Sequence, residues 1–385
     1  MNKTYLDNAS TSFPKPPCVA DEMKHFINEV GCNINRGGYE NAYSAAEVVL
    51  DTREQLCCFF HSSVPSQNVI FTPNITYSLN YIIKGLLKAG DHVLVTSMEH
   101  NAMMRPLVQM TKYGVTFDRI PCTRQGELMV EQLEPLIRPN TKAVMMLHSS
   151  NVCGSVMPLA QVGEICRRHN LFFVVDTAQS AGVLPIDMDA MGIDALAFTG
   201  HKSLLGPQGI GGFLIRNEMA DQMEPLIAGG TGSISDSEET PSFLPDKFEP
   251  GTMNLPAIYG LHASLTYLAE TGIEAVRQGE AALTRQFLEG LAAMEQHLTV
   301  VGPAAAENRT SVVSIDCLHR DNAEVAFLLD NQYGIMTRCG LHCAPNAHKT
   351  LGTFPHGTIR FSIGHFSTRQ EIQYALDCLT KVFQG

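Results

Sequence analysis

Short apolar runs rich in β-branched residues alternate with amphipathic stretches through the middle of the chain. The runs predict β-strands at residues 68–71, 92–96, 115–120, 142–147, 171–175, 195–199 and 212–215. The amphipathic stretches between them predict helices at residues 76–88, 102–112, 130–136 and 159–169. Strands that are apolar on both faces and alternate with helices indicate an α/β fold with a mainly parallel sheet covered by helices. Ligands of such sheets bind just beyond the carboxyl ends of the strands.

The pattern changes near residue 255, where longer helices replace the short alternating units. The later part of the chain predicts helices and short strands at residues 255–270, 273–296, 311–315, 358–361 and 368–383. We expect a large domain at residues 16–254 and a smaller α+β domain at residues 255–385. Residues 229–252, rich in Gly, Ser, Pro and acids, predict a long loop before the second domain, and long ordered loops are often functional.

Composition and charge narrow the classes of partner. Of 385 residues, 44% are hydrophobic and 17% are charged, the ordinary balance of a soluble globular protein. The formal net charge of -12 disfavours nucleic-acid and anionic-membrane partners. No apolar run reaches the roughly 18–20 residues that cross a bilayer, and the amino terminus lacks a secretory signal, so a cytoplasmic location is expected. The 11 cysteines are odd in number and irregularly spaced, as expected for reduced thiols.

An acid and a lysine each follow a predicted strand. Asp176 comes directly after one apolar run, where an isolated Asp is more often a turn former or a helix cap. Lys202 follows the next strand and lies between glycines. Together they supply what pyridoxal phosphate needs, an amine for the Schiff base and a carboxylate that keeps the pyridine nitrogen protonated. The glycines at residues 206–212 allow close backbone approach, and their spacing does not match a dinucleotide-binding motif.

The segments around these two residues resemble the class V aminotransferase family of fold-type I pyridoxal-phosphate enzymes. Further segments resemble its cysteine desulfurase and selenocysteine lyase branch, and the resemblance runs in order through essentially the whole chain. These segments are residues 5–11, 98–102, 150–154, 248–252, 338–344 and 357–362. The resemblance implies a large domain with a mainly parallel seven-stranded sheet, a smaller α+β domain, and an N-terminal segment, residues 1–15, that packs near the active site.

The resemblance assigns cofactor contacts around the ring of pyridoxal 5'-phosphate. Lys202 is the Schiff-base lysine, and Asp176 is the partner of the pyridinium nitrogen. Gln179 donates a hydrogen bond to the ring hydroxyl oxygen. His100 stacks on the ring and shuttles protons as a catalytic residue, and Asn151 lies near both the substrate and the ring oxygen.

The resemblance also places the cofactor phosphate at the start of a helix, where free N–H groups favour an anion. Ile75 and Thr76 mark that start, and Thr199 and His201 are the other phosphate-side residues. Residues 73–77 read Pro-Asn-Ile-Thr-Tyr where relatives often have a Gly-Thr-Thr-Glu-like turn, although Thr76 still matches. Thr252 is expected to approach the cofactor of a partner subunit, which implies a homodimer.

Substrate chemistry falls to Cys343, Arg360 and Ala9. Cys343 matches the sulfur-accepting nucleophile of the family, and the positive charge near it favours the thiolate. Arg360 would clamp the substrate carboxylate with its planar fork, and Ala9 would border the substrate. Cys343 and Arg360 are 17 positions apart (360 minus 343), and this short connection resembles that of the group II, Suf-type desulfurases. Such a loop holds the thiol near the substrate but limits its reach, so release of the sulfur is expected to need an acceptor protein.

The sequence therefore predicts a cysteine desulfurase that converts L-cysteine to L-alanine and forms a persulfide on Cys343. A selenocysteine lyase would use the same residues, and a class V transaminase or C–S lyase would work without Cys343. A catalytically silent scaffold is disfavoured because Lys202, Asp176 and Arg360 occur together. A zinc site at Cys57, Cys58 and His61, or at His342, Cys343 and His348, lacks the paired spacing of metal ligands.

Overall fold

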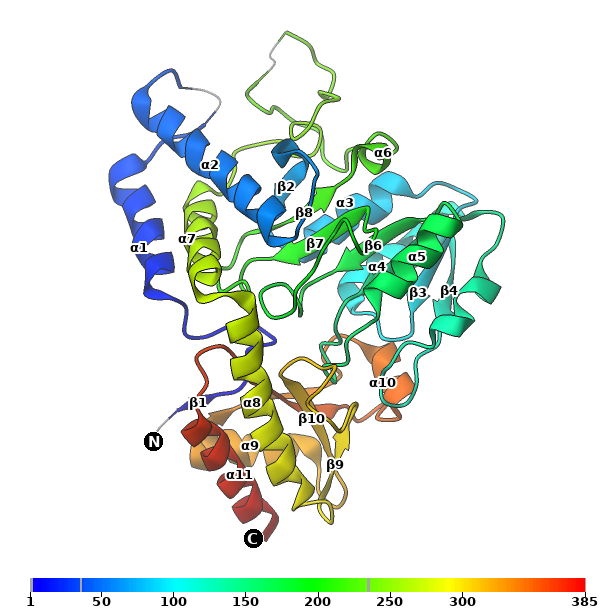
Figure 1. Cartoon of the computed structure of the whole chain (residues 1–385), viewed down its shortest axis with the longest axis vertical. Coiled ribbons are helices and arrows are strands. Elements are labelled where there is room, and N and C mark those ends of the chain that lie inside the picture. The colour runs from blue at the N-terminus through cyan, green and yellow to red at the C-terminus, as the bar shows by residue number, and fades with distance from the viewer. Residues whose placement is uncertain (1–2, 35–36, 234–235, 385) are drawn as a thin grey trace.

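Seven strands form the central sheet, in the order β2-β8-β7-β6-β5-β3-β4 (Figure 1). The computed structural model describes residues 3–34, 37–233 and 236–384. The strands are β2 Val69–Thr72, β3 His92–Thr96, β4 Thr116–Ile120, β5 Thr141–Leu147, β6 Phe172–Asp176, β7 Ala195–Thr199 and β8 Gly211–Ile215. β8 runs antiparallel to β2 and to β7, and the other neighbouring pairs are parallel. The predicted mainly parallel sheet is confirmed.

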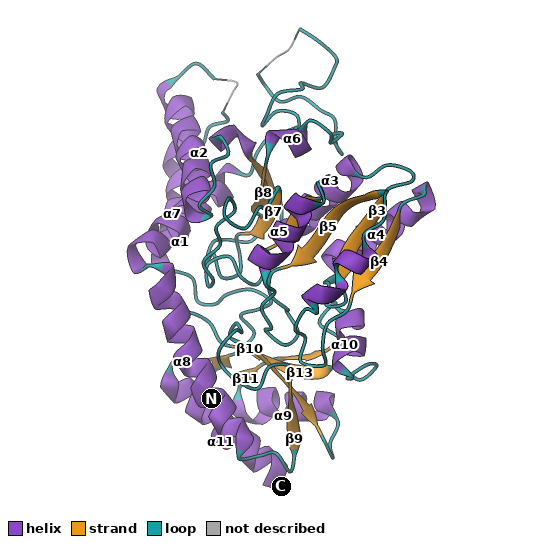
Figure 2. Cartoon of the chain, turned by 45° about the vertical axis from the view of Figure 1, so that its right-hand side comes forward, coloured by secondary structure: helices purple, strands orange, loops and turns teal. Residues whose placement is uncertain are grey.

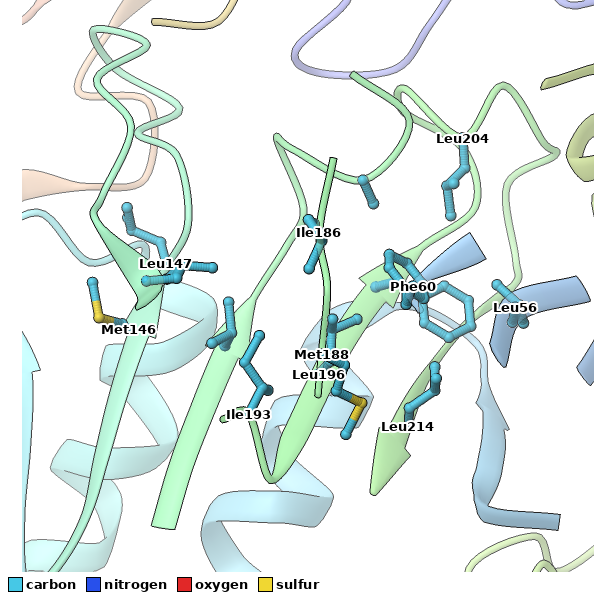
Figure 3. Packing of buried hydrophobic residues seen from close by; sticks show 14 of the residues in the cluster. Leu56, Phe60, Met146, Leu147, Ile186, Met188, Ile193, Leu196, Leu204 and Leu214 are labelled. Carbon is cyan, nitrogen blue, oxygen red and sulfur yellow. The ribbon is translucent and has the colours of Figure 1, made fainter. Parts of the chain in front are cut away.

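Helices cover both faces of this sheet, because its strands alternate between two apolar cores. The helices of the first face are α3 Ile75–Leu86 and α4 Asn101–Met110, and those of the second are α2 Glu40–Phe59, α5 Leu159–Arg168 and α7 Leu255–Thr271. In β7, Ala195 and Ala197 belong to the first core, whereas Leu196 and Phe198 belong to the second. Figure 3 shows Leu196 with Leu56 and Phe60 at the end of α2 in this second core. The sheet is therefore rigidly held where its strands end.

A second, four-stranded antiparallel sheet lies in the later part of the chain, in the order β12-β13-β10-β9. Its strands are β9 Leu298–Val301, β10 Val312–Cys317, β12 Arg338–Gly340 and β13 Thr358–Ser362, and β1 Thr4–Tyr5 pairs in parallel with β11 Ile335–Met336. Its helices are α8 Ile273–Ala292, α9 Asn322–Tyr333, α10 Pro345–Leu351 and α11 Arg369–Gln384. A third apolar core joins α8, α9 and α11 to this sheet. The N-terminal strand is thus part of the C-terminal layer, as Figure 2 shows.

The long helical stretch after the loop is split between the two layers. α7 packs against α1 Pro17–His25 and α2 beside the large sheet, whereas α8 packs against α11 beside the small one (Figure 1). The proposed division between residues 254 and 255 stays a prediction. The remaining elements are short: η1 Phe26–Val30, η2 Ser66–Asn68, η3 Thr111–Tyr113 and α6 Asn217–Ala220.

All seven predicted strands of the large sheet form, with ends shifted by at most one residue. The predicted helix at residues 130–136 is wrong, because two 3-10 turns occupy it, η4 Val130–Gln132 and η5 Glu134–Leu136. Pro135 has no N–H to continue a helical ladder through this stretch. No helix in the described part of the chain has both the length and the apolar character that crossing a membrane requires.

Candidate active site

The carboxyl ends of β6 and β7 place the predicted acid and lysine at one edge of the central sheet. β6 ends at Asp176, and its parallel neighbour β7 ends at Thr199, just before Lys202 in sequence. Asp176 is buried, Lys202 is partly buried, and the charge of Asp176 acts on the pKa of Lys202. We call Asp176, Thr199, His201 and Lys202 the sheet-edge cluster.

Burial controls the protonation of this cluster. It lowers the pKa of Lys202 to about 8, although the Asp176 carboxylate opposes the shift. Roughly a tenth of the amine is therefore neutral, and so nucleophilic, at pH 7, far more than at the ordinary pKa of a lysine. Burial also raises the pKa of Asp176, against the hydrogen bond that its carboxylate accepts from the Ala178 N–H at 2.8 Å. A cation brought against Asp176 would restore its charged form.

His100 begins α4, and its side chain caps that helix. Its Nδ1 accepts a hydrogen bond from the Ala102 N–H at 3.0 Å. Burial, followed by the charges of Lys202 and Arg338, lowers the pKa of His100 to about 3. The ring is therefore neutral, and because Nδ1 is an acceptor, its proton is on Nε2.

Two predicted amide side chains are tied to loops around the cluster. Gln179 donates from Nε2 to the Ala9 carbonyl at 3.0 Å, which fixes the N-terminal segment beside the turn after β6. Asn151 donates from Nδ2 to the His342 carbonyl at 2.7 Å. The Asn151 Oδ1 atom is buried and has no hydrogen-bond partner among the described residues. It is available to a donor on a bound molecule.

The start of α3 lies against the end of β7. A Cβ atom on Gly211, opposite Thr199 in the sheet, would be 2.9 Å from the Asn74 Cα, so only glycine allows this approach. The Asn74 side chain caps α3 by accepting from the Thr76 N–H at 3.1 Å. The N–H of Thr76, expected to be free for an anion, is thus already paired, although Thr76 itself is exposed.

Two other polar groups, at and just after the carboxyl end of β7, have no hydrogen-bond partner among the described residues. The Thr199 hydroxyl and the His201 Nδ1 atom are buried, and no described residue hydrogen-bonds either atom. Burial, with Lys202 and Lys15 nearby, lowers the pKa of His201 to about 4. Unpaired buried polar atoms are costly, so these two atoms fit a site for an oxygen-rich ligand group.

Thr252 is exposed on the segment that precedes α7. It borders a cavity of about 410 Å³, which Thr72, Pro73 and Tyr77 also line next to the start of α3. A buried ion pair holds this segment, with Arg53 Nη2 and Glu249 Oε2 at 2.7 Å. Ile75 is buried at the first turn of α3. Contact of Thr252 with a partner's cofactor stays a prediction.

Arg360 lies on β13 and has partners far away in the sequence. Its Nη2 donates to Asp7 Oδ1 at 2.7 Å and to Ser10 Oγ at 2.8 Å, and its Nη1 donates to the Asn151 carbonyl at 3.1 Å. Arg338 lies directly opposite Arg360 in the antiparallel pair of β12 and β13. We call Asp7, Ser10, Arg338, Cys343 and Arg360 the arginine cluster.

Cys343 is exposed in a turn whose backbone is strained. Both His342 and Cys343 have positive φ angles, 47° and 59°, which residues other than glycine rarely adopt. The turn is held because the Cys343 carbonyl accepts from the Asn101 N–H at 2.8 Å and Asn151 holds the His342 carbonyl. Arg338 Nη2 is 3.5 Å from the Cys343 Sγ and donates toward it.

The two clusters lie near each other. The charges of Arg360, Arg338 and Cys343 all act on the pKa of Lys202. Asp7 and Ser10 were not predicted as site residues, although the motif at residues 5–11 contains both. A carboxylate and a hydroxyl so close in sequence to Ala9, which was predicted to border the substrate, could have indicated that Asp7 and Ser10 also belong to the site.

Comparison with known proteins shows the family to which the chain belongs. The family model Aminotransferase class-V matches residues 4–375. A probable cysteine desulfurase from Methanothermobacter thermautotrophicus is 31% identical over 383 residues, covering 98% of this chain and 94% of that protein. The cysteine desulfurase of Haloferax volcanii is 30% identical over 384 residues, covering 97% of this chain and 88% of that protein.

Solved structures of cysteine desulfurases have a similar fold. The apo structure of a cysteine desulfurase from Thermococcus onnurineus has a TM-score of 0.92 at 31% identity, covering 100% of this chain and 95% of that one. The cysteine desulfurase CsdA from Escherichia coli, with an S-sulfonic acid, has a TM-score of 0.88 at 26% identity, covering 99% and 94%. The chain belongs to the aminotransferase class-V family.

Proposed function

We propose that this protein is a pyridoxal-phosphate-dependent cysteine desulfurase that passes sulfur from L-cysteine to an acceptor protein through Cys343. The observation that carries the proposal is the meeting of two clusters. A buried aspartate and a partly buried lysine lie at the sheet edge, and Arg360 and the exposed Cys343 thiol are near enough for their charges to act on the pKa of Lys202. Relatives named cysteine desulfurase match nearly the full length of the chain.

The sheet-edge cluster has the groups that would hold the cofactor. Lys202 would bond the aldehyde carbon, and Asp176 would pair with the protonated ring nitrogen. The unpartnered Thr199 hydroxyl and His201 Nδ1, with Thr76 at the start of α3, would receive the phosphate. When bound, the cofactor supplies an electron sink for the electron pair left at the substrate Cα.

Around the ring, the neutral His100 would lie against the cofactor, with its Nε2 proton available for transfer. Gln179 already donates to the Ala9 carbonyl, so its donation to the ring hydroxyl oxygen requires that this hydrogen bond be exchanged or shared. The buried Asn151 Oδ1 has no protein partner to give up. These contacts would orient the ring.

The chain's own groups divide the reaction between them. Arg360 would bind the substrate carboxylate, and the Lys202 amine, with a pKa lowered to about 8 by burial, would accept the Cα proton. The Cys343 thiolate, beside Arg338, would attack the substrate sulfur. The substrate C–S bond would break and a new S–S bond would form on Cys343. A proton equivalent to the one lost by the Cys343 thiol would be added at the substrate Cβ, and Lys202 would return its proton to Cα. One L-cysteine and one thiol thus give one L-alanine and one persulfide.

The held turn explains why an acceptor is needed. The hydrogen bonds from Asn101 and Asn151 fix the carbonyls on either side of the thiol, so the sulfur cannot travel far. Cys343 is exposed, so a partner can reach it. We propose that a small acceptor protein comes to the thiol.

We also propose a homodimer in which Thr252 of one subunit approaches the partner's cofactor. Thr252 is exposed, and the cavity beside it is bordered by two exposed apolar side chains, Tyr77 and Ile227. Apolar surface of this kind is typical of an interface.

The proposal is tested by replacing the thiol. We expect Cys343→Ala to keep the cofactor and its absorbance but to form alanine from L-cysteine at least about 100-fold more slowly. Cys58→Ala, at another exposed thiol, should behave like the wild type. Full activity in Cys343→Ala would contradict the role of this thiol. Faster turnover of selenocysteine than cysteine would assign the selenocysteine lyase reaction instead, and pyruvate in place of alanine would indicate a C–S lyase.

A further inference from the structure

The carboxylate of Asp7 already occupies the arginine proposed to bind the substrate. Asp7 Oδ1 is 2.7 Å from Arg360 Nη2, and Ser10 Oγ is 2.8 Å from the same nitrogen. Ser10 also donates to Asp7 Oδ1 at 2.9 Å, so the two acceptors are linked to each other. A protein carboxylate thus lies where a ligand carboxylate is expected.

The Arg360 guanidinium has too few N–H bonds to hold Asp7, Ser10 and a bidentate substrate carboxylate at the same time. A guanidinium has five N–H bonds, and a carboxylate binds it best through two parallel ones. The two edges that offer parallel bonds are Nη1 with Nη2 and Nε with Nη2, and both hydrogens of Nη2 are engaged. The Nε atom has no partner among the described residues, but it lies on only one edge. A bidentate substrate carboxylate must therefore displace Asp7 or Ser10.

Charge and exposure indicate that Asp7 leaves. Arg338 and Arg360 are directly opposite each other on adjacent strands, an arrangement that repels without an anion. Asp7 supplies that anion in the absence of substrate, and a substrate carboxylate would replace it charge for charge. The Asp7 side chain is 21% exposed, against 1% for Arg360, so the aspartate can turn toward water while the arginine cannot.

We propose that Asp7 is a built-in competitor of the substrate carboxylate, because it holds Arg360 until a ligand with an anionic carboxylate replaces it and so lowers the affinity for such ligands. This inference rests on the proposed function, in which Arg360 receives the carboxylate of an amino acid. A neutral analogue cannot take over the charge of Asp7 and leaves the Asp7–Arg360 pair intact. The N-terminal segment thereby weakens the binding of amino acids that carry a free α-carboxylate and leaves the binding of neutral analogues unchanged.

Binding of two product-like ligands to the holoenzyme tests this role. L-Alanine carries the carboxylate, and L-alaninamide replaces it with a neutral amide. We expect Asp7→Asn, which keeps the shape but removes the competing charge, to bind L-alanine roughly threefold to tenfold more tightly by calorimetry. Binding of L-alaninamide should stay within about twofold.

Two further variants control this measurement. Asp21→Asn removes one exposed charge from α1, away from any ion pair among the described residues, and should bind both ligands as the wild type does. Asp7→Ser, which also removes the charge, replaces Asp7→Asn if that variant does not fold, as judged by thermal melting. Unchanged or weaker L-alanine binding in the folded Asp7 variant would overturn the inference.

The two proposals fail in different ways. If wild-type holoenzyme forms no alanine from L-cysteine, the proposed function is wrong, whatever the binding data show. If the wild type forms alanine but loss of the Asp7 charge does not tighten L-alanine binding, only the role of Asp7 is wrong.

Discussion

The sheet-edge cluster and the arginine cluster are built in different ways. Asp176 and Lys202 come from neighbouring parallel strands whose ends are fixed by a packed core on both faces. The arginine cluster draws Asp7 and Arg360 from opposite ends of the chain, 353 positions apart, and carries its thiol on a strained turn. The first cluster is suited to hold a cofactor without moving, and the second to exchange partners around a substrate.

The largest effect is expected at the rigid cluster. Lys202→Ala removes both the covalent tether and the amine that accepts the Cα proton. We expect alanine formation from L-cysteine to fall by at least about 1000-fold, with loss of the cofactor's visible absorbance band. Lys112→Ala, at an exposed lysine after α4, is the matched control. Retained absorbance and activity would show that another lysine holds the cofactor.

A smaller effect, on binding rather than on the cofactor, is expected at the arginine cluster. Arg360→Lys keeps the charge but offers no pair of parallel N–H bonds. We expect KM for L-cysteine to rise roughly 10-fold to 100-fold, with a smaller change in kcat. Steady-state kinetics check this, and Arg369→Lys, at an exposed arginine, serves as the control. An unchanged KM would remove Arg360 from carboxylate binding.

The smallest effect on activity is expected at Glu280 on α8, a buried acid in the C-terminal part of the chain. Its carboxylate accepts from Ser311 Oγ at 2.6 Å, and burial raises its pKa from 4.5 to about 7. Because the native pKa is the higher one, the folded protein binds this proton more tightly. The contribution of Glu280 to stability is therefore greatest below about pH 4.5 and is lost as the pH rises through about 7.

Glu280→Gln should remove this dependence. We expect the free energy of unfolding to rise by about 2–3 kcal/mol at pH 8 and to change little at pH 4.5, in urea titrations at both values. Alanine formation should stay near the wild-type rate. An equal effect at both pH values would mean that packing, rather than the charge, is responsible.

The same contrast explains what the sequence could predict. Strand ends follow from local apolar patterning, so the seven strands and the sites of Asp176 and Lys202 were predicted from residues close in sequence. The contact of Asp7 with Arg360 depends on pairing of β1 with β11 and on the bridge between Asp7 and Ser362 at the end of β13, which no local period encodes. The positive φ angle of Cys343 was also beyond prediction, because glycine, and less strongly Asn or Asp, signals that conformation in a sequence and cysteine does not.

The most direct test of the proposed chemistry is to locate the transferred sulfur. Holoenzyme would be given L-cysteine without acceptor or reductant, digested under non-reducing conditions and analysed by mass spectrometry. We predict that the peptide containing Cys343 gains one sulfur atom for each alanine formed. Alanine formed with the added sulfur on Cys339, on another cysteine or on none would contradict the assignment of Cys343.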